Sequence, residues 1–337
     1  MTHTKANKSK IFALFFNLIM YLALILGIMF ASLTFKVYAE GGTGATGGLT
    51  IGGETSSSGE GYSYDGKTQT LTLQNYNGKE IDFSGKTIKV EGNNTITVDK
   101  TSEKFPFPGN AAYKCYSAIY SRYAITITGS GSLAINMETS DVDETCYSIY
   151  AREGMTINGG NITININSYY GGGSCGLYSN NGSVIIGGSA SLDITTKSSA
   201  IGTVGNDIVI SGTGSKKIQV NVGDKNWATS AIESVDGNVD ISGPGKVTIL
   251  YTNGDNSHAI KADKQIKIHS NADVETSAMI RSYFTDAAGS PSVEISDSTV
   301  KIPFVFLERK GFVKITDSNV TIKSENDDSY RTGCVYA

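Results

Sequence analysis

Short runs in which apolar and polar residues alternate recur along the chain from Tyr116 onward, in a phrase of about 20 to 31 residues. Each copy contains a small–apolar–x–small run, a turn, an Ile-x-Ile run, a glycine-rich stretch and a third alternating run, as over residues 147–164. Such alternation is typical of strands that bury one face. Three short strands per copy, with no helix between them, can bury their apolar sides together only by winding into a coil. The sequence therefore predicts an all-β fold, a right-handed parallel β-helix with three short strands per coil and about eight to nine coils.

The first strand of each copy has a central apolar residue, and these residues are predicted to form one inward-facing row along the coil axis. The row is Ile119, Ile149, Leu177, Ile201, Ile232, Ile260, Ile280, Leu307 and Val335. Residues two positions away from each centre are also expected to face inward, because neighbours in a strand alternate between faces. Most of these residues are small, such as Ser117, Cys175 and Ser179, although Tyr147 is large. Small residues beside one large aliphatic side chain suit the narrow interior of a three-sided coil.

The residue after each central apolar residue is expected on the outer surface of the same sheet. These residues are Tyr120, Tyr150, Tyr178, Gly202, Glu233, Lys261, Arg281, Glu308 and Tyr336. Coils stack about 4.8 Å apart, so the first three would form a column of tyrosine rings. Such rings can contact the apolar faces of sugars while their phenols hydrogen-bond hydroxyl groups, and the charged residues could orient a neutral or acidic glycan. The alternatives are rings that stack only for mutual packing and charges that form a solvated ladder of alternating sign.

The first 39 residues have the pattern of an export signal. Lysines at the start precede an almost wholly apolar run over residues 11–35, and Val37-Tyr38-Ala39 has small residues where signal peptidase cleaves. We expect cleavage after Ala39 and a secreted or cell-surface protein, with no membrane contact beyond this segment. An uncleaved anchor is the alternative, because 25 apolar residues are long enough to span a bilayer.

The rest of the chain is predicted to contain a linker and one domain. Residues 40–61 are rich in Gly, Ser and Thr and are expected to form a flexible linker. Residues 62–337 are expected to form the β-helix domain, with residues 62–83 as an N-terminal cap. Residues 102–114 contain Pro106 and Pro108 and are expected to loop out of the strand ladder.

Charge and cysteine content narrow the classes of partner. The formal net charge is -4, and removal of the four lysines and no acids in residues 1–39 takes it to -8. This charge argues against nucleic acid as a partner. Four cysteines are too few for a disulfide framework at this length. Cys115 and Cys146 open the first strands of consecutive coils, so either one disulfide joins them or both are buried thiols.

Two kinds of loop before the first strands are candidates for ligand binding. Trp227, the only tryptophan, lies in a polar loop and could stack on a sugar ring; the alternative is that it covers the coil edge. Acidic loops include Asp141, Asp143, Glu144 and Asp255. Calcium takes six to eight oxygen ligands, which makes these residues candidate calcium ligands, although acidic surface loops are usually only solvated.

Few residues are arranged as catalytic groups require. His258 and His269 are the two histidines beyond the export segment, and neither has a serine or cysteine nucleophile motif around it. Glu233 and Glu308 lie three coils apart in the predicted alignment, about 14 Å along the axis. That separation is too large for the carboxylate pair of a glycosidase. The sequence therefore favours a protein without catalytic activity.

The repeat resembles that of a clostridial family of carbohydrate-binding β-helix proteins. The resemblance rests on residues 257–268 (SHAIKADKQIKI) and on residues 147–166 with the Gly159-Gly160 pair. The segment from Tyr62 to Tyr76 is similar to the start of β-helical modules in large surface proteins of Gram-positive bacteria. The resemblance covers about residues 62–337 and implies export, sugar-polymer binding, bound calcium and a scaffold related to pectate lyases. Where that family repeats Asp-Asp-Gly before the first strand, this sequence has mostly Ser, Cys or His.

Three functional hypotheses follow. The leading one is an exported, non-catalytic module for adhesion or for binding a plant or bacterial polysaccharide, with Tyr120, Tyr150, Tyr178, Trp227, Glu233 and Lys261 as contacts. The second is a calcium-dependent polysaccharide lyase, for which Lys261, Arg281 and Arg309 are nominally placed as bases. The third is a structural stalk at the cell surface. Calcium is the one cofactor that the sequence suggests.

Overall fold

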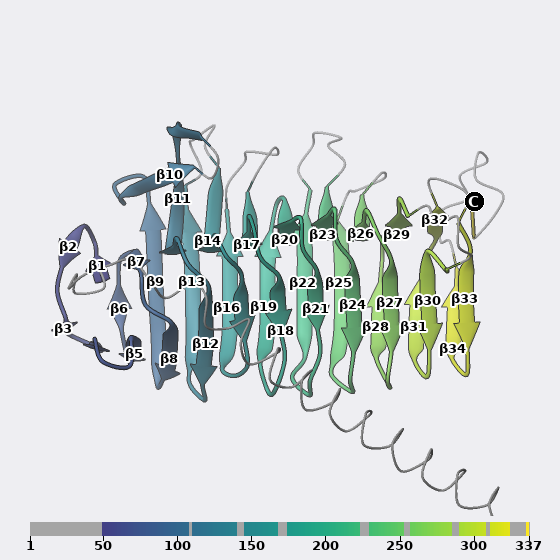
Figure 1. Ribbon diagram of the computed structural model, residues 1–337, viewed down its shortest axis with the longest axis horizontal. Coiled ribbons are helices and arrows are strands. Elements are labelled where there is room, and N and C mark those ends of the chain that lie inside the picture. The colour runs from purple at the N-terminus through teal and green to yellow at the C-terminus, as the bar shows by residue number, and fades with distance from the viewer. Residues whose placement is uncertain are drawn as a thin grey trace, which may run out of the picture. The chain divides into compact units, whose positions relative to one another are not determined.

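The computed structural model of the protein describes residues 49–107, 110–139, 145–167, 174–222, 229–252, 257–284, 290–307, 311–323 and 335–336. The described strands form three stacked sheets whose members are mostly parallel (Figure 1). Successive strands along the chain go to sheets 1, 2 and 3 in turn, so each round of three makes one coil. This arrangement confirms the predicted right-handed parallel β-helix.

Sheet 1 holds the first strand of each coil. Its order is β2 (Glu54–Thr55), β1 (Leu49–Ile51), β7 (Ile81–Phe83), β11 (Asn110–Ser121), β14 (Cys146–Ala151), β17 (Cys175–Ser179), β20 (Ser199–Val204), β23 (Ser230–Val235), β26 (His258–Ala262), β29 (Met279–Ser282), β32 (Val305–Leu307) and β35 (Val335–Tyr336). One further strand, β10 (Lys104–Phe107), pairs with β11.

Sheets 2 and 3 hold the second and third strands. Sheet 2 runs in the order β3 (Ser58–Gly59), β4 (Tyr62–Asp65), β5 (Thr70–Gln74), β8 (Thr87–Glu91), β12 (Ile125–Gly129), β15 (Met155–Ile157), β18 (Val184–Ile186), β21 (Ile208–Ile210), β24 (Val239–Ser242), β27 (Ile266–His269), β30 (Val293–Ser296) and β33 (Val313–Thr316). Sheet 3 runs in the order β6 (Asn77–Gly78), β9 (Asn93–Asp99), β13 (Ser132–Glu138), β16 (Asn161–Ile166), β19 (Ser191–Thr196), β22 (Lys216–Asn221), β25 (Lys246–Thr252), β28 (Asp273–Thr276), β31 (Thr299–Ile302) and β34 (Asn319–Ile322).

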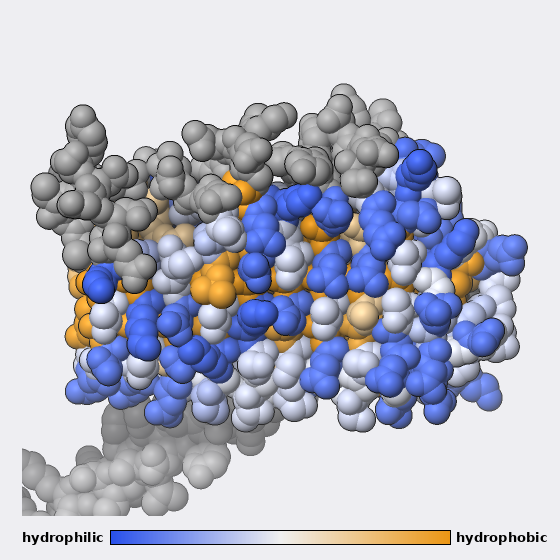
Figure 2. All heavy atoms as spheres, turned by 180° about the vertical axis from the view of Figure 1, so that it is seen from behind, coloured by the Kyte–Doolittle hydropathy of each residue, from blue (hydrophilic) through white to orange (hydrophobic). Residues whose placement is uncertain are grey.

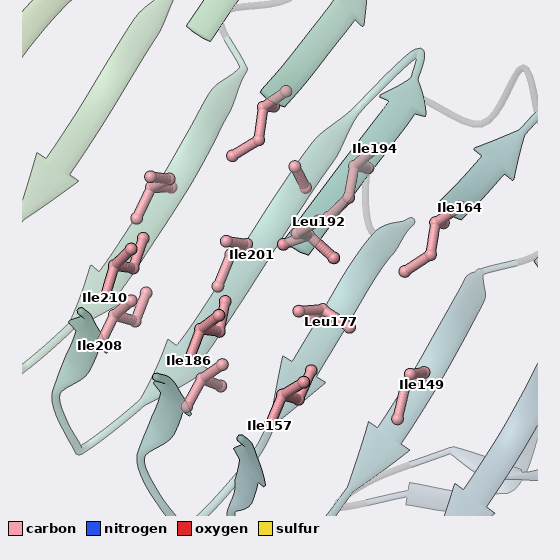
Figure 3. Packing of buried hydrophobic residues seen from close by; sticks show 14 of the residues in the cluster. Ile149, Ile157, Ile164, Leu177, Ile186, Leu192, Ile194, Ile201, Ile208 and Ile210 are labelled. Carbon is pink, nitrogen blue, oxygen red and sulfur yellow. The ribbon is translucent and has the colours of Figure 1, made fainter. Parts of the chain in front are cut away.

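Aliphatic side chains from all three sheets meet inside the coil. Figure 3 shows Ile149, Leu177 and Ile201 of sheet 1 in line on successive strands, with the isoleucines of sheets 2 and 3 on the neighbouring strands. Those three residues have no exposed surface. Burial of each methylene contributes about 0.8 kcal/mol, so these rows supply the main stabilising term. On the outside, the face seen in Figure 2 is mostly hydrophilic, with apolar side chains visible between the polar ones.

The predicted register of sheet 1 is confirmed over most of its length. The ladder pairs Ile119 with Ile149 and continues through the predicted centres to Ile280. The next partner is Val305, which in turn pairs with Val335, so the prediction of Leu307 at this point is wrong. Both Val305 and Leu307 satisfy a period of two in a run of three apolar residues, and the shift of two residues follows from that ambiguity.

The expectation that residues two before each centre face inward is wrong for Tyr147 and Cys175, and also for Ser199, which pairs with Cys175. The sulfur of Cys175 lies 3.4 Å from where a Cβ of Gly202 would be, on the outer side of the sheet. Gly176 faces the core instead, since a Cβ there would meet the side chain of Ile194 at 3.3 Å. Gly176 and Leu177 therefore both face inward. Two successive inward residues make a local irregularity of the β-bulge type, which turns the preceding residue outward.

Residues two after each centre are buried, as predicted, and their hydroxyls hold the turn of the preceding coil. Thr203 donates a hydrogen bond to the carbonyl of Gly182 at 2.7 Å, and Ser234 donates to the carbonyl of Asn206 at the same distance. Ser282 donates a hydrogen bond to the carbonyl of Lys264, in the equivalent turn, at 3.0 Å. These bonds explain why small hydroxyl residues recur here, because each one pairs a backbone carbonyl at a sheet-1 turn.

Antiparallel strands close the N-terminal end. β4 pairs with β5, β3 pairs with β4, and β1 pairs with β2 and β7. Leu49 is 2% exposed and belongs to the core. Part of the predicted flexible linker is therefore ordered, because β1, β2 and β3 lie within residues 40–61. Apolar Leu49 and Ile51 alternate on a short strand that the high glycine content of this segment obscured.

β10 corrects the prediction that residues 102–114 only loop out. Its residues pair antiparallel with β11, and Pro106 stands opposite Lys114. β10 has no second partner among the described strands. Proline is tolerated on such an edge strand, because the missing N–H can be on the side away from the ladder. The side chain of Phe105 is thereby laid over the outer face of sheet 1.

The cysteines and the export segment can now be placed. Cys115 belongs to a cluster on the outer side of sheet 1, whereas Cys146 belongs to the core, and no disulfide joins the two. Side chains on opposite sides of a strand pair cannot meet the geometry of that bond. The predicted signal peptide, residues 1–39, lies outside the described residues. Within the described part of the chain, no helix is both long and apolar enough to cross a membrane.

Candidate functional site

The candidate site is the outer surface of sheet 1, where one residue per strand forms what we call the outer row. In register it consists of Asp82, Tyr120, Tyr150, Tyr178, Gly202, Glu233, Lys261, Arg281, Phe306 and Tyr336. The predicted order is confirmed from Tyr120 to Arg281, and the backbone of Tyr336 pairs in register with Phe306. Phe306 stands where Glu308 was predicted, as a result of the two-residue shift described above.

Five rings of the outer surface stack into what we call the aromatic cluster: Phe105, Tyr120, Tyr147, Tyr150 and Tyr178. The centroids of Phe105 and Tyr120 are 4.6 Å apart with nearly parallel planes. Tyr120 and Tyr150 follow at 5.1 Å, and Tyr147 and Tyr178 at 4.7 Å. Cys115 and Cys175 pack against these rings. The predicted column of tyrosines therefore exists, and it includes two rings that the sequence pattern did not place there.

Most of this cluster is not open to a ligand. Tyr120 is 5% exposed and Tyr150 is 1% exposed, whereas Tyr178 is partly exposed. The expectation of an extended aromatic surface is therefore wrong for the first two rings, and Tyr178 is the one predicted tyrosine of the three that is not buried. Phe105 of β10 is one cause, because its ring lies directly on Tyr120.

Burial also sets the protonation of these phenols. It raises the pKa of Tyr147 and of Tyr150 well above the usual value of tyrosine. Burial, with the neighbouring Cys175 and the carboxylate of Glu233, raises the pKa of Tyr178 to about 12. The Tyr178 phenol is therefore protonated throughout the physiological range and can donate a hydrogen bond.

The other half of the outer row carries what we call the charged cluster: Glu233, His258, Lys261, Arg281 and Tyr283. Lys261 donates to the Oε1 atom of Glu233 at 2.5 Å, and both side chains are about a quarter exposed, at 22% and 27%. The ammonium of Lys261 lies 5.4 Å from the ring centroid of Tyr283. The two predicted contacts, Glu233 and Lys261, thus form one ion pair with no net charge.

Arg281 is held between aromatic rings. Its guanidinium carbon lies 4.6 Å from the centroid of Tyr283 and 5.0 Å from that of Phe306. A guanidinium over a ring face gains from the ring quadrupole, by roughly 0.5–1 kcal/mol at an exposed site and more when desolvated. The planar cation is therefore fixed in orientation by its neighbours.

His258 completes the cluster as a neutral imidazole. Its Nε2 atom lies 3.0 Å from Nη1 of Arg281, and its Nδ1 atom lies 3.5 Å from the hydroxyl of Ser230. A guanidinium can only donate, so Nε2 accepts and the proton is on Nδ1. Burial, then the charges of Arg281 and Lys261, lower the pKa of His258 to about 4. This tautomer cannot take a proton from Ser230, so the pair lacks the arrangement of a serine nucleophile with its base.

The structure brings some predicted residues together and leaves others undescribed. Tyr120, Tyr150 and Tyr178 share one cluster, and Glu233 contacts Lys261. The remaining predicted contacts lie outside the described residues: Trp227, Asp141, Asp143, Glu144 and Asp255. In the described segments, no group of three or more His, Cys, Asp or Glu side chains is arranged to hold a metal ion. The predicted calcium site therefore stays a prediction.

Sequence reasoning missed His258, Tyr283 and Phe306 as members of the site. His258 was ambiguous because its strand position, two before the centre, faces outward only through the bulge. Tyr283 directly follows β29 and was not part of the repeated phrase. A signal for it does exist, since an aromatic residue two positions after Arg281 can reach the same outer surface.

Fold and site together define a right-handed parallel β-helix protein with an aromatic and charged row on the outside of sheet 1. No protein-family model matches the chain, and neither a curated protein nor a solved structure matches it. The β-helix scaffold is therefore established by the structure itself, and the resemblance to the carbohydrate-binding family extends no further than that scaffold.

Proposed function

We propose that the protein is an exported, non-catalytic module that binds a plant or bacterial polysaccharide through the outer surface of sheet 1. The observation that carries the proposal is the in-register row of Tyr178, Glu233 and Lys261, all of which are partly exposed. A half-open ring face beside a paired carboxylate and ammonium offers an apolar contact, acceptors and donors within a few strands.

The arrangement of charges favours binding over catalysis. Glu233 is paired with Lys261, and His258 accepts from Arg281, so the acid and base groups of the charged cluster are engaged with neighbours. General acid–base catalysis requires a group that reaches the substrate in the right protonation state. A polysaccharide ligand instead needs fixed donors and acceptors, which these pairs provide.

A structural stalk is the second candidate, and one observation favours it. Tyr120 and Tyr150 are buried within the aromatic cluster, so their stacking contributes packing between coils rather than ligand surface. A stalk needs stiffness along its axis and no ligand. The two functions make different predictions for substitutions at Tyr178, which is partly exposed.

The test is retention of the full-length chain on a broad set of insoluble and acidic polysaccharides, with and without a calcium chelator. We expect retention on at least one polymer. A chain that elutes with the void on every polymer would refute polysaccharide binding and leave the stalk. Incubation with polygalacturonate and calcium provides the lyase arm: a rise in ultraviolet absorbance from unsaturated products would show catalysis and contradict the non-catalytic assignment.

A further inference from the structure

The column of rings in the aromatic cluster ends at a defined position. Rings follow one another from Phe105 to Tyr178 with centroid separations between 4.6 and 6.2 Å. One side of the Tyr178 ring is covered by Tyr147 and Tyr150. The next strand, β20, contributes no ring, because the outer row there has Gly202. The register thus has a place for one more ring, which β20 does not supply.

Both outward positions of β20 are small. Gly202 pairs with Tyr178, and Ser199 pairs with the outward-facing Cys175. The ring of Tyr178 leans towards this strand, since a Cβ added to Gly202 would lie 3.2 Å from its Cδ2 atom. A Cβ at this position would crowd the Tyr178 ring, so glycine gives that ring room to extend over β20. The absence of a larger side chain leaves the end of the ring column uncovered by β20.

The two strands after β20, β23 and β26, supply Glu233 and Lys261, whose charges cancel in one ion pair. Glu233 pairs in register with Gly202 on one side and with Lys261 on the other. The carboxylate accepts from the ammonium and retains further lone pairs for hydroxyl groups. A free anion would meet the charge of Glu233, and a free cation would meet that of Lys261. The groups therefore match an uncharged ligand with several hydroxyls and one apolar face.

We propose that a neutral pyranose unit of a glycan binds over β20, stacked on Tyr178 in the place of the missing ring and hydrogen-bonded to Glu233 and Lys261. This inference rests on the proposed polysaccharide binding and assigns its ligand class and position. The apolar face of the sugar continues the column of rings, and its hydroxyls reach the ion pair on the next strands. The buried rings, from Phe105 to Tyr150, support Tyr178 and do not touch the ligand.

The test measures affinities of the full-length chain for soluble neutral oligosaccharides from cellulose, xylan, mannan and chitin, with oligogalacturonate as the acidic arm. We expect a neutral oligosaccharide to bind most tightly. Tyr178→Ala should weaken that binding about three- to tenfold, the range for loss of one aromatic contact. Glu233→Gln should weaken it roughly ten- to a hundredfold, because a hydrogen bond to a charged acceptor is lost.

Two further variants distinguish loss of the sugar position over β20 from a general loss of binding through misfolding. Gly202→Tyr puts a side chain of the protein against Tyr178 and over β20, so it should abolish binding, while a circular dichroism spectrum with the wild-type strand signal shows that the coil is still folded. Tyr123→Ala removes a tyrosine that is 51% exposed and outside the outer row, and it should leave affinity unchanged. If the wild-type chain binds a neutral glycan and Tyr178→Ala and Gly202→Tyr bind it equally well, this position is refuted while polysaccharide binding stands. Preference for oligogalacturonate would refute the neutral ligand class, and binding of no oligosaccharide would refute both proposals.

Discussion

Arg281 donates a hydrogen bond from Nη1 to Nε2 of His258 across 3.0 Å, so the imidazole can keep this contact only while it is neutral. The two residues lie on adjacent strands, β26 and β29. Protonation of His258 would place a second positive charge beside the guanidinium of Arg281. The hydrogen bond would also be lost, because both groups would then be donors only. The charged cluster is therefore sensitive to acid.

The first prediction concerns stability at acidic pH. The pKa of His258 is about 4 in the folded chain and 6.5 in its unperturbed state, so the unfolded chain takes up the proton first as the pH falls. This contribution to the free energy of unfolding is fully present above about pH 6.5 and decreases by on the order of 3 kcal/mol as the pH falls to 4. Urea denaturation of the full-length chain across this range measures it.

His258→Gln provides the decisive variant for the pH effect. The amide oxygen of glutamine can accept from Arg281, and the side chain does not titrate. The decrease in stability between about pH 6.5 and 4 should be smaller in this variant than in the wild type. His269→Gln, on the partly exposed side chain that contacts Asp240, is the matched control and should keep the full decrease. Equal decreases in wild type and His258→Gln would contradict the account.

The second prediction concerns the packing role of the buried rings. Tyr150 is 1% exposed and stacks on Tyr120, so Tyr150→Ala removes a large side chain that packing cannot easily replace. We expect a loss of about 3–5 kcal/mol in the free energy of unfolding. Tyr123→Ala, on an exposed ring, should change it by less than about 0.5 kcal/mol. Similar small effects for both variants would show that the aromatic cluster contributes little to packing.

The third prediction concerns a buried lysine. Lys216 is 1% exposed, and its ammonium donates to the carbonyls of Ser211 at 2.7 Å and Gly214 at 2.6 Å. Its position pairs with Leu192 and Val247 in otherwise apolar rows. Burial lowers the pKa of Lys216, and the two carbonyls offset the cost of the buried charge.

Lys216→Met tests whether those carbonyl bonds matter. The apolar chain fills similar space but leaves two carbonyls without their donor, so we expect a loss of about 2 kcal/mol in the free energy of unfolding. Lys217→Met is the control, because Lys217 is half-exposed and its ion pair with Asp193 spans 3.5 Å. A Lys216→Met chain that is as stable as the wild type would show that an apolar residue serves this turn equally well.

The fourth prediction concerns the hydroxyls that hold each turn. Thr203→Val preserves the shape of the side chain and removes the donor that pairs the carbonyl of Gly182. Loss of one buried hydrogen bond should lower the free energy of unfolding by about 1–2 kcal/mol. Thr156→Val, on the partly exposed outer face of β15, should change it by less than about 0.5 kcal/mol. Chemical denaturation compares the two variants. Equal changes in the free energy of unfolding would contradict the conclusion that the Thr203 hydroxyl stabilises the turn.

The sequence alone predicted the β-helix and most of the register of sheet 1. Each first strand alternates apolar and polar residues around one central aliphatic residue, so few alignments between successive coils are possible. It failed at Leu307, where Val305 satisfies the same alternation. It also failed at Tyr147 and Cys175, because strict alternation cannot anticipate the bulge that turns them outward. Both errors lie at positions where local pattern is ambiguous and packing decides.

The sequence predicted the order of residues along the outer row, but not which of their side chains are exposed. The outer row from Tyr120 to Arg281 follows from register, which the repeat specifies. The burial of Tyr120 depends on the ring of Phe105, which belongs to β10. The sequence did not predict this strand, because it contains Pro106. Contacts made by a strand outside the repeat, such as Phe105 with Tyr120, carry no periodic signal and are seen only in the structure.

The most direct test of glycan binding is a crystal structure of the full-length chain with the neutral oligosaccharide that it binds most tightly. The account predicts electron density for a sugar ring over Gly202, with its apolar face on Tyr178 and a hydroxyl within hydrogen-bonding distance of Glu233. Density for the sugar on any other surface, with the Tyr178 ring unoccupied, would contradict it.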